Sequence, residues 1–376
     1  MILHLFHDDK VCNHVIANFE EVYPEGNVFI CICDKENLRY IKKSDKVIFL
    51  NRGEYDISHP MFAKVDKILI HYLDVDKINF IEKHYPPNTK VDIYWSLWGG
   101  DMYNKVLYSM GYKIYDEDNY AYPFKYRIIN FLKELLGKSS SRKEVDKLIF
   151  FIENRVDYIM TFQAEFDLIS EKWISNKFRP KCIPNLPIYY PIEDVLGDLF
   201  DRKVTGKNIM IGNSASFSNN HIYACKYLSG INTSGLKKIM PLSYGGSNKY
   251  KNHIKNTCYR FWGEDYLPLE NFMPLKDYNE LMLSCSNYVY GNWRQEAVGN
   301  IVIALYLGAK VYASEKSPLL RIFEDFGIKL YKTEQISSFD FYEAEDEVTI
   351  CQNRQKILNL YSKEAILNHI KTIFDK

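Results

Sequence analysis

Short apolar runs alternate with helix-like stretches along the whole chain, and this alternation limits the folds that the sequence can adopt. Several runs are continuously apolar, as in strands that are covered on both faces. The pattern predicts parallel strands joined by right-handed crossovers, which is the doubly wound α/β architecture. The predicted strands are Ile2–Phe6, Val28–Cys33, Lys46–Leu50, Lys67–Leu73, Val91–Leu97, Tyr158–Phe162, Asn208–Gly212, Lys238–Ser243, Tyr288–Tyr290, Lys310–Ala313 and Ile328–Tyr331.

The length of the chain predicts two domains. A single hydrophobic core stops growing at about 250–300 residues, and this chain has 376. Three prolines between residues 184 and 191 interrupt the pattern before a new strand begins at Asn208. We therefore expect two Rossmann-like domains that face each other across a cleft, 1–190 and 205–355. A final helical segment, 356–376, is expected to pack back on the first domain.

Charge and cysteine content exclude several classes of protein. Lys plus Arg and Asp plus Glu are each 48, so the chain lacks the net positive charge that favours sequence-independent binding to nucleic acid. No run reaches the roughly 18–20 apolar residues of a membrane span, and we expect no signal peptide. The eight cysteines lack metal-site spacing, which indicates buried thiols in a reducing cytoplasm. The isolated sequence Asp74-Val-Asp76 is best explained by chance, so no metal is expected.

A loop of small polar residues joins the strand ending near Gly212 to a helix beginning near His221. Its sequence is Gly212-Asn-Ser-Ala-Ser216, followed by Asn219-Asn220-His221. Loop N–H groups and a helix N-terminus form an anion site suited to a diphosphate. Gly212 permits close approach of the backbone. The segment is neither a P-loop nor a GxGxxG motif, so an ordinary turn with a helix cap is the alternative.

A second loop of the same kind runs from Tyr290 to Asn300 and contains Arg294, Gln295 and Glu296. Glu296 either complements the dipole of the following helix or bonds the ribose of a nucleotide. Two such loops in one domain, both at the carboxyl ends of strands, indicate a nucleotide site more strongly than either loop alone.

Two segments of the first half carry groups suited to proton transfer. Asp101 follows Trp95, Trp98 and two glycines, and a carboxylate beside aromatic rings has a raised pKa that suits a general base. Capping of the next helix is the equal alternative. Around the first strand, a second set could supply a base and its orienting partner, or could be scattered surface residues. This set is His4, His7, Asp8, Asp9 and His14.

The stretch 122–138 predicts a basic amphipathic helix. An apolar stripe is flanked by Lys125, Arg127 and Lys133, with a single acid. Such a helix is typical of contact with a membrane surface. Packing on the chain's own sheet is the alternative.

Four segments together resemble a known family: YWSLWGGDMY, IMIGNSASFSNNHIYA, IMPLSYGG and YGNWRQEAVGNIVIALYLGAKVY. They are similar to the 4-acetamido-4,6-dideoxygalactose (Fuc4NAc) transferases of glycosyltransferase family 56. The resemblance covers roughly residues 90–320. It implies tandem Rossmann-like domains of the GT-B type and a nucleotide-diphosphate sugar as donor, carrying TDP or UDP. It also implies a polyprenyl-diphosphate-linked glycan as acceptor, and catalysis without metal or other cofactor.

The resemblance also implies roles for individual residues. The residues expected at the donor are Gly212, Asn213, Ser214, Asn219, His221, Tyr244, Arg294, Gln295, Glu296 and Asn300. Those expected on the acceptor side are Trp95, Trp98, Tyr103 and His14, with Asp101 as the catalytic carboxylate. Tyr244 and Trp293 are further rings expected to line the site. The family pattern predicts Arg-Gln-Gln-Gly where this chain has Arg294-Gln-Glu-Ala297.

The resulting hypothesis is sugar transfer to a lipid-linked acceptor by a peripheral enzyme at the inner face of the cytoplasmic membrane. Its role would be in the synthesis of bacterial surface polysaccharide. A nucleotide-sugar 2-epimerase on the same fold is one rival, and it would convert free donor without an acceptor. A non-catalytic sugar-nucleotide-binding protein is the other.

Overall fold

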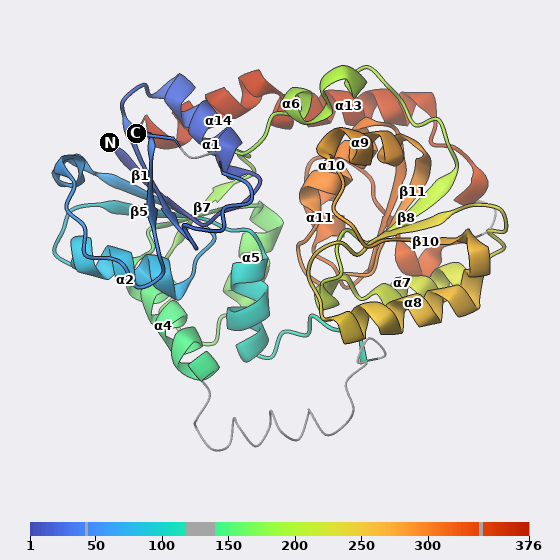
Figure 1. The fold of residues 1–376 in the computed structure, drawn as a ribbon, viewed down its shortest axis with the longest axis horizontal. Helices are drawn as coiled ribbons and strands as arrows, with labels where there is room; N and C mark the ends of the chain where they lie inside the picture. The colour runs from blue at the N-terminus through green and yellow to red at the C-terminus, as the bar shows by residue number, and fades with distance from the viewer. Residues whose placement is uncertain (42–43, 118–139, 338–340, 376) are drawn as a thin grey trace. The chain divides into compact units, whose positions relative to one another are not determined.

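The computed structural model describes residues 1–41, 44–117, 140–337 and 341–375 (Figure 1). The chain divides into two compact units. Of the described residues, the first unit holds those of Met1–Tyr112, Leu132–Pro191 and Lys363–Lys376. The second holds those of Lys113–Phe131 and Ile192–Ser362. The chain therefore returns to its first unit at its end.

The first unit is built on seven parallel strands in the order β3-β2-β1-β4-β5-β6-β7. These are β1 (Ile2–Phe6), β2 (Asn27–Ile32), β3 (Val47–Leu50), β4 (Lys67–His71), β5 (Asp92–Ser96), β6 (Tyr158–Thr161) and β7 (Lys181–Pro184). Its helices are α1 (Cys12–Val22), α2 (Val75–His84), α4 (Ser140–Arg155), α5 (Gln163–Lys172) and α14 (Lys363–Phe374).

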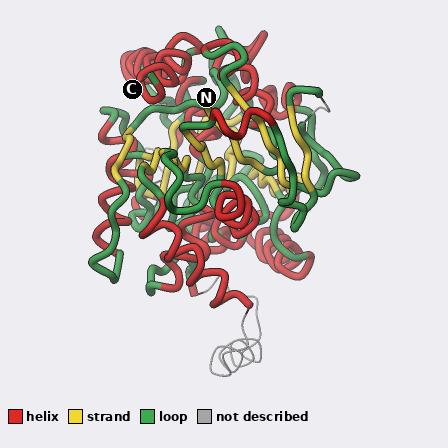
Figure 2. Tube along the Cα trace, turned by 90° about the vertical axis from the view of Figure 1, so that its left-hand side faces the viewer, coloured by secondary structure: helices red, strands yellow, loops and turns green. Residues whose placement is uncertain are grey.

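Helices cover both faces of this sheet. In Figure 1, α1 and α14 lie on one side of the strands, and α2 and α4 lie on the other. Figure 2 shows the same layering, with strands running between helices above and below them. Three side chains of α14, Ile366, Ile370 and Phe374, are buried in the same apolar cluster as Val15 and Phe19 of α1. Burial of this apolar stripe explains why the end of the chain joins the first unit.

The second unit repeats the plan with six parallel strands in the order β10-β9-β8-β11-β12-β13. These are β8 (Asn208–Ile211), β9 (Lys238–Pro241), β10 (Tyr266–Leu269), β11 (Cys285–Tyr290), β12 (Lys310–Ala313) and β13 (Tyr331–Lys332). Its helices are α6 (Ile192–Leu196), α7 (His221–Ser229), α8 (Asn248–Trp262), α9 (Leu275–Leu283), α10 (Val298–Tyr306), α11 (Leu319–Asp325) and α13 (Glu347–Tyr361).

In both sheets the chain begins in the middle and reverses direction once. In the first sheet it runs outward from β1 to β3, and then crosses to β4 on the other side of β1. In the second sheet it runs outward from β8 to β10, and then crosses to β11 on the other side of β8. Right-handed crossovers on the two sides of such a point leave by opposite faces. In this architecture the carboxyl ends of the two strands beside such a point are the usual ligand position.

The predicted α/β architecture is confirmed, but two strands were missed. The strand β7 and the strand β10 both lie at sheet edges, have four residues and contain a proline, Pro184 and Pro268. Proline is tolerated at an edge, where no neighbouring strand needs its N–H. The last strand is also displaced, since residues Tyr331–Lys332 form β13 rather than Ile328–Tyr331.

Candidate functional site

The loop that follows β8 is folded around Gly212. Register pairs Ile211 with Val289 of β11, and the Gly212 N–H donates to the Val289 carbonyl at 3.0 Å. Gly212 has a φ of 67°, and a Cβ there would lie 2.7 Å from Asn219 Oδ1 and 3.1 Å from His221 Nε2. The same Asn219 oxygen accepts the Asn213 N–H at 2.9 Å. Glycine is therefore required both by backbone conformation and by space.

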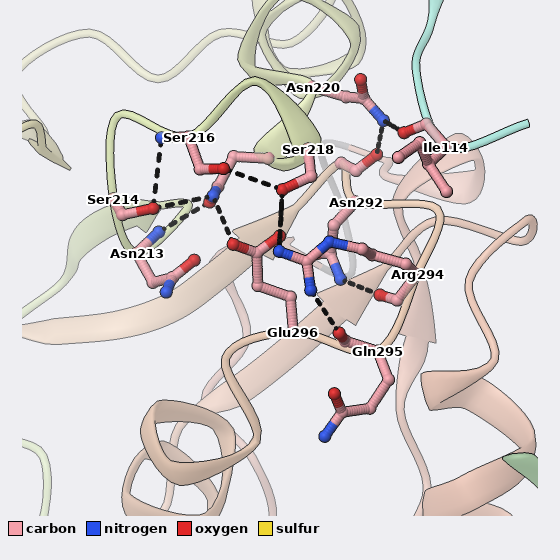
Figure 3. A network of polar contacts seen from close by, with 12 residues as sticks. Ile114, Asn213, Ser214, Ser216, Ser218, Asn220, Asn292, Arg294, Gln295 and Glu296 are labelled. Atoms are coloured by element: carbon pink, nitrogen blue, oxygen red, sulfur yellow. Dashed lines mark hydrogen bonds and ion pairs between the residues drawn. The ribbon is translucent and has the colours of Figure 1, made fainter. Parts of the chain in front are cut away.

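This loop is linked to the loop after β11 by a continuous polar network (Figure 3). Ser218 Oγ donates to Glu296 Oε2 at 2.7 Å and accepts from Arg294 Nη2 at 3.0 Å. The Asn219 amide donates to Glu296 Oε1 and to Ser214 Oγ, each at 3.2 Å. Arg294 and Glu296 also form an ion pair at 3.0 Å with both side chains at most 10% exposed. The two charges compensate each other in this buried setting.

Four buried polar atoms on these two loops and the adjoining strand end have no hydrogen-bond partner among the described residues. They are Asn213 Oδ1, Tyr290 Oη, Arg294 Nε and Gln295 Oε1. Figure 3 shows the Gln295 side chain turned away from the Arg294–Glu296 pair. An unpaired buried polar atom is costly, so these atoms mark where a polar ligand would be stabilised.

The next two residues anchor the start of α7. Asn220 has a φ of 47°, and its amide donates to the carbonyls of Ile114 at 3.1 Å and Gly291 at 3.2 Å. Its Oδ1 accepts the Asp116 N–H at 3.0 Å. His221 is fully buried with Nδ1 3.1 Å from the Tyr250 hydroxyl. Burial lowers the pKa of His221 to about 3, and a backbone contact with Ser214 opposes this.

Other predicted donor residues lie around this network. Tyr244 is 45% exposed, and its carbonyl accepts the Ala215 N–H at 2.8 Å, which places it beside the first loop. Asn300 points elsewhere, since its amide donates to the Tyr278 hydroxyl at 3.2 Å. Trp293 is 5% exposed, which leaves little of its ring available to a sugar.

Sequence reasoning missed Lys316 at this edge. It lies in the loop after β12, the strand next to β11, and its Nζ is 3.8 Å from the centre of the Trp293 ring. A cation at this distance is attracted by the face of an indole. The signal available in the sequence was a lysine three residues after the end of a predicted strand.

The first unit brings three rings together at its own switch point. His7 follows β1, Tyr72 follows β4 and Trp98 follows β5. The His7 ring centre lies 5.2 Å from that of Tyr72 and 5.4 Å from that of Trp98. His7 Nδ1 is buried without a hydrogen-bond partner among the described residues. Tyr72 has a φ of 66°, a costly conformation for a large side chain that is concentrated at functional sites.

The charged groups near His7 have opposite effects on its pKa. Burial lowers its pKa to about 4, and the positive charge of Lys77 acts in the same direction. The carboxylates of Asp9 and Asp74 raise it. His7 is therefore neutral near pH 7 and can accept a proton.

Asp101 is 2% exposed and is held from three directions. Its Oδ2 accepts from Trp95 Nε1 at 2.7 Å and from the Leu73 N–H at 3.0 Å, and its Oδ1 accepts from the Trp98 N–H at 3.1 Å. Burial raises the pKa of Asp101, whereas these hydrogen bonds lower it. The side chain does not cap the helical turn Met102–Leu107 that follows. It fastens the end of β4 to the turn after β5.

Two of the predicted acceptor-side rings are core residues, which corrects their assignment. Trp95 and Tyr103 are completely buried, so neither has a face open to a sugar. Trp98 is partly exposed, and His14 on α1 lies edge-on to Tyr190 with ring centres 6.1 Å apart. The predicted membrane-contact residues Lys125, Arg127 and Lys133 lie outside the described residues.

The described part of the chain offers neither a metal-ligand cluster nor a helix suited to a membrane span. No three His, Cys, Asp or Glu side chains gather there as ligands for a metal ion. Asp74 instead caps α2 by accepting the Lys77 N–H at 3.0 Å, and it also pairs with the Lys77 ammonium group. None of the helices in those residues is long and apolar enough to cross a membrane.

Solved structures similar to this chain define its class. Sucrose-phosphate synthase from Thermosynechococcus elongatus is 12% identical, with a TM-score of 0.63 over 100% of this chain and 98% of that one. HepE from Anabaena, in complex with UDP and glucose, is 10% identical, with a TM-score of 0.63 and complete coverage of both chains. Trehalose 6-phosphate synthase from Burkholderia multivorans is 9% identical, with a TM-score of 0.57 over 99% and 95%. The fold is that of the GT-B glycosyltransferases.

A family model narrows the class. The model described as 4-alpha-L-fucosyltransferase, glycosyl transferase group 56, matches residues 177–367, a little more than half of the chain. The chain therefore belongs to glycosyltransferase family 56. The match includes both loops of the polar network. It does not include the segment from Trp95 to Tyr103, which also contributed to the resemblance in sequence.

We predict that Gly212→Ala destabilises the second unit by roughly 2 kcal/mol or more, because φ is positive and the new Cβ would collide with Asn219. Gly235→Ala is the matched control. Gly235 has a φ of 77° but open space around its Cβ position, so only the conformational cost of about 1 kcal/mol is expected. Chemical denaturation measures both. Equal losses in the two variants would contradict the packing argument.

We predict that Ala297→Gly stabilises the protein by about 0.5–1 kcal/mol. Ala297 has a φ of 66° at the start of α10, a conformation that costs a non-glycine residue more than the extra chain entropy of glycine. Ala63→Gly, at an exposed position without positive φ, should instead be neutral or destabilising. A lower denaturation midpoint for Ala297→Gly would show that the position is not strained.

Proposed function

We propose that this protein transfers a sugar from a nucleotide-diphosphate donor to a polyprenyl-diphosphate-linked oligosaccharide. An amino-dideoxy sugar is the expected substrate class, and the inner face of the cytoplasmic membrane is the expected location. Family membership supports glycosyl transfer. The observation that carries the proposal is the polar network at the β8/β11 switch point, with unpaired polar atoms beside it.

The second unit is proposed to hold the donor. Loop N–H groups around Gly212, together with Asn213 and Ser214, would receive the diphosphate. Gln295 would use its unpaired oxygen on the nucleotide or its sugar. Glu296 is committed to Ser218, Asn219 and Arg294, and therefore fixes the two loops relative to each other. In HepE, a protein of the same fold, UDP and glucose were bound together.

The first unit is proposed to hold the acceptor, with His7 as the group that takes its proton. Sequence reasoning preferred Asp101 for this step. We now favour His7 because its Nδ1 has no partner, whereas both Asp101 oxygens already accept hydrogen bonds. A neutral imidazole can accept a hydroxyl proton; Asp9 and Asp74 favour the resulting cation, whereas burial and the charge of Lys77 oppose it.

The direct test is incubation of the full chain with UDP-, GDP- and TDP-sugars, with and without a short polyprenyl-diphosphate disaccharide. Transfer of sugar to the lipid supports the proposal. Isomerisation of free donor without acceptor would replace it with an epimerase. A donor that raises the melting temperature but undergoes neither reaction would indicate a binding protein.

Once a donor is identified, we predict that Gln295→Ala raises the donor KM about tenfold with little change in stability, which corresponds to loss of about one hydrogen bond. The control is Gln355→Ala on α13, since the exposed Gln355 amide donates only to Asn359. Steady-state kinetics with varied donor measure the effect. An unchanged donor KM in Gln295→Ala would remove this residue from the donor site.

We predict that His7→Gln lowers kcat by about 10²-fold or more while the melting temperature changes little, as expected for loss of a general base. Asp101→Asn should do the opposite. Its new NH2 group would replace one carboxylate oxygen and face either the Trp98 N–H or the Trp95 and Leu73 donors, at a cost of about 1–3 kcal/mol of stability. Activity per folded molecule at saturating substrates distinguishes the two. A folded but inactive Asp101→Asn, with an active His7→Gln, would restore Asp101 as the base.

A further inference from the structure

Two histidines in the core of the first unit belong to a chain of hydrogen bonds that has no part in the proposed chemistry. His4 of β1 and His71 of β4 are both fully buried, and His4 Nδ1 lies 3.3 Å from His71 Nε2. At one end, His4 Nε2 lies 3.2 Å from Asn27 Oδ1. At the other, His71 Nδ1 lies 3.3 Å from the Tyr189 hydroxyl, which also contacts Ser96 Oγ and Trp98 Nε1.

The direction of every hydrogen bond in this chain can be deduced from Asn27. Its amide nitrogen faces the carbonyls of Phe19 at 3.1 Å and Tyr23 at 2.8 Å, and Glu20 Oε1 at 3.2 Å. All three are acceptors, so the orientation of the amide is fixed and Oδ1 faces His4. An oxygen that can only accept requires His4 Nε2 to carry the hydrogen.

The remaining assignments follow one after another. Because a neutral imidazole has one N–H, His4 Nδ1 must accept, and His71 Nε2 must donate to it. His71 Nδ1 then accepts the single hydrogen of the Tyr189 hydroxyl. The Tyr189 oxygen accepts from the Trp98 indole N–H. Its contact with Ser96 Oγ also fits Tyr189 as the donor, but a phenol has one hydrogen, so with that hydrogen directed to His71 the Ser96 hydroxyl is the donor. These assignments take both histidines as neutral, the form that burial favours, since it lowers the pKa of His4 to about 3 and that of His71 well below its ordinary value.

We propose that this chain, Asn27–His4–His71–Tyr189, positions the Trp98 indole in the acceptor site. Trp98 is bonded to the last member of the chain through Nε1, and its ring lies against His7 and Tyr72. A polar network whose members are all satisfied has one low-energy arrangement. The chain thus fixes the plane of the ring that flanks His7. These are positioning residues, and they act through Trp98 rather than on the substrate.

The part of this inference that concerns the acceptor rests on the proposed function, whereas the hydrogen-bond directions do not. The first measurement therefore uses the unmutated full chain without substrate. Long-range ¹H–¹⁵N spectra should show His4 and His71 as neutral imidazoles protonated at Nε2, assigned with His4→Gln and His71→Gln. If either histidine is protonated at Nδ1, or is charged at pH 7, the proposed hydrogen-bond directions are wrong.

The second measurement follows the Trp98 indole N–H, assigned with Trp98→Phe. Tyr189→Phe removes the hydroxyl that this N–H bonds, so its resonance should move upfield and exchange faster with solvent. Ser96→Ala leaves that hydroxyl in place and should give a smaller shift. Tyr158→Phe on β6 is the control, because Tyr158 lies outside the chain and packs on Tyr94. A Trp98 resonance that is unmoved in Tyr189→Phe would refute the positioning role.

Kinetics separate positioning from a merely structural role. In Tyr189→Phe the acceptor KM should rise about tenfold while the donor KM stays unchanged, and Tyr158→Phe should change neither. Equal losses for donor and acceptor would indicate general loosening of the fold and overturn the inference. If the unmutated protein transfers no sugar, the proposed function fails. The two spectroscopic measurements still decide whether the hydrogen-bond chain from Asn27 to Tyr189 exists and whether it holds Trp98.

Discussion

The handedness of the crossover between parallel strands determines where this protein can bind anything. Each sheet begins at its centre and reverses once, between β1 and β4 or between β8 and β11. Right-handed connections then leave by opposite faces, and the central loops are free of covering helices. His7 and Tyr72 occupy these loops in the first unit, and the Gly212 and Arg294 loops occupy them in the second. One topological rule, applied twice, supplies both candidate sites.

The two sites manage buried charge differently. In the second unit Arg294 and Glu296 neutralise each other, and Ser218 and Asn219 bond to the pair, while Arg294 Nε has no partner among the described residues. In the first unit both oxygens of the buried Asp101 carboxylate accept hydrogen bonds from neutral N–H donors. In the loops of both units some buried polar atoms have no partner among the described residues. Two residues with positive φ, Tyr72 and Ala297, also lie beside these loops.

Much of the fold could be predicted from the sequence, because apolar runs covered on both faces identify central strands. The edge strands β7 and β10 escaped because they are short, partly exposed and interrupted by proline. For the site, the loops around Gly212 and Arg294 were predicted to follow strands of one domain, and the structure shows that those two strands are adjacent. The sequence pattern did not predict which side chains of a loop are buried and which face the candidate site. Trp95 and Trp98 differ by three positions, yet one is core and the other flanks His7. One of the hydrogen bonds to Asp101 comes from the N–H of Leu73, which is distant in sequence, so it could not be predicted from the residues around Asp101.

Asn220 has a consequence for the modularity of the chain. The second unit looks separable, since most of it is the single stretch Ile192–Ser362. However, the buried Asn220 amide is completed by the backbone of Ile114 and Asp116, which belong to a part of the gene that otherwise encodes the first unit. A fragment beginning at residue 192 would leave that amide without two of its partners at the start of α7, next to the donor loop. The second unit is therefore built from two separate stretches of sequence. Recombination between related genes at residue 192 would transfer all six strands of its sheet, but not the Ile114 and Asp116 backbone groups that bond Asn220.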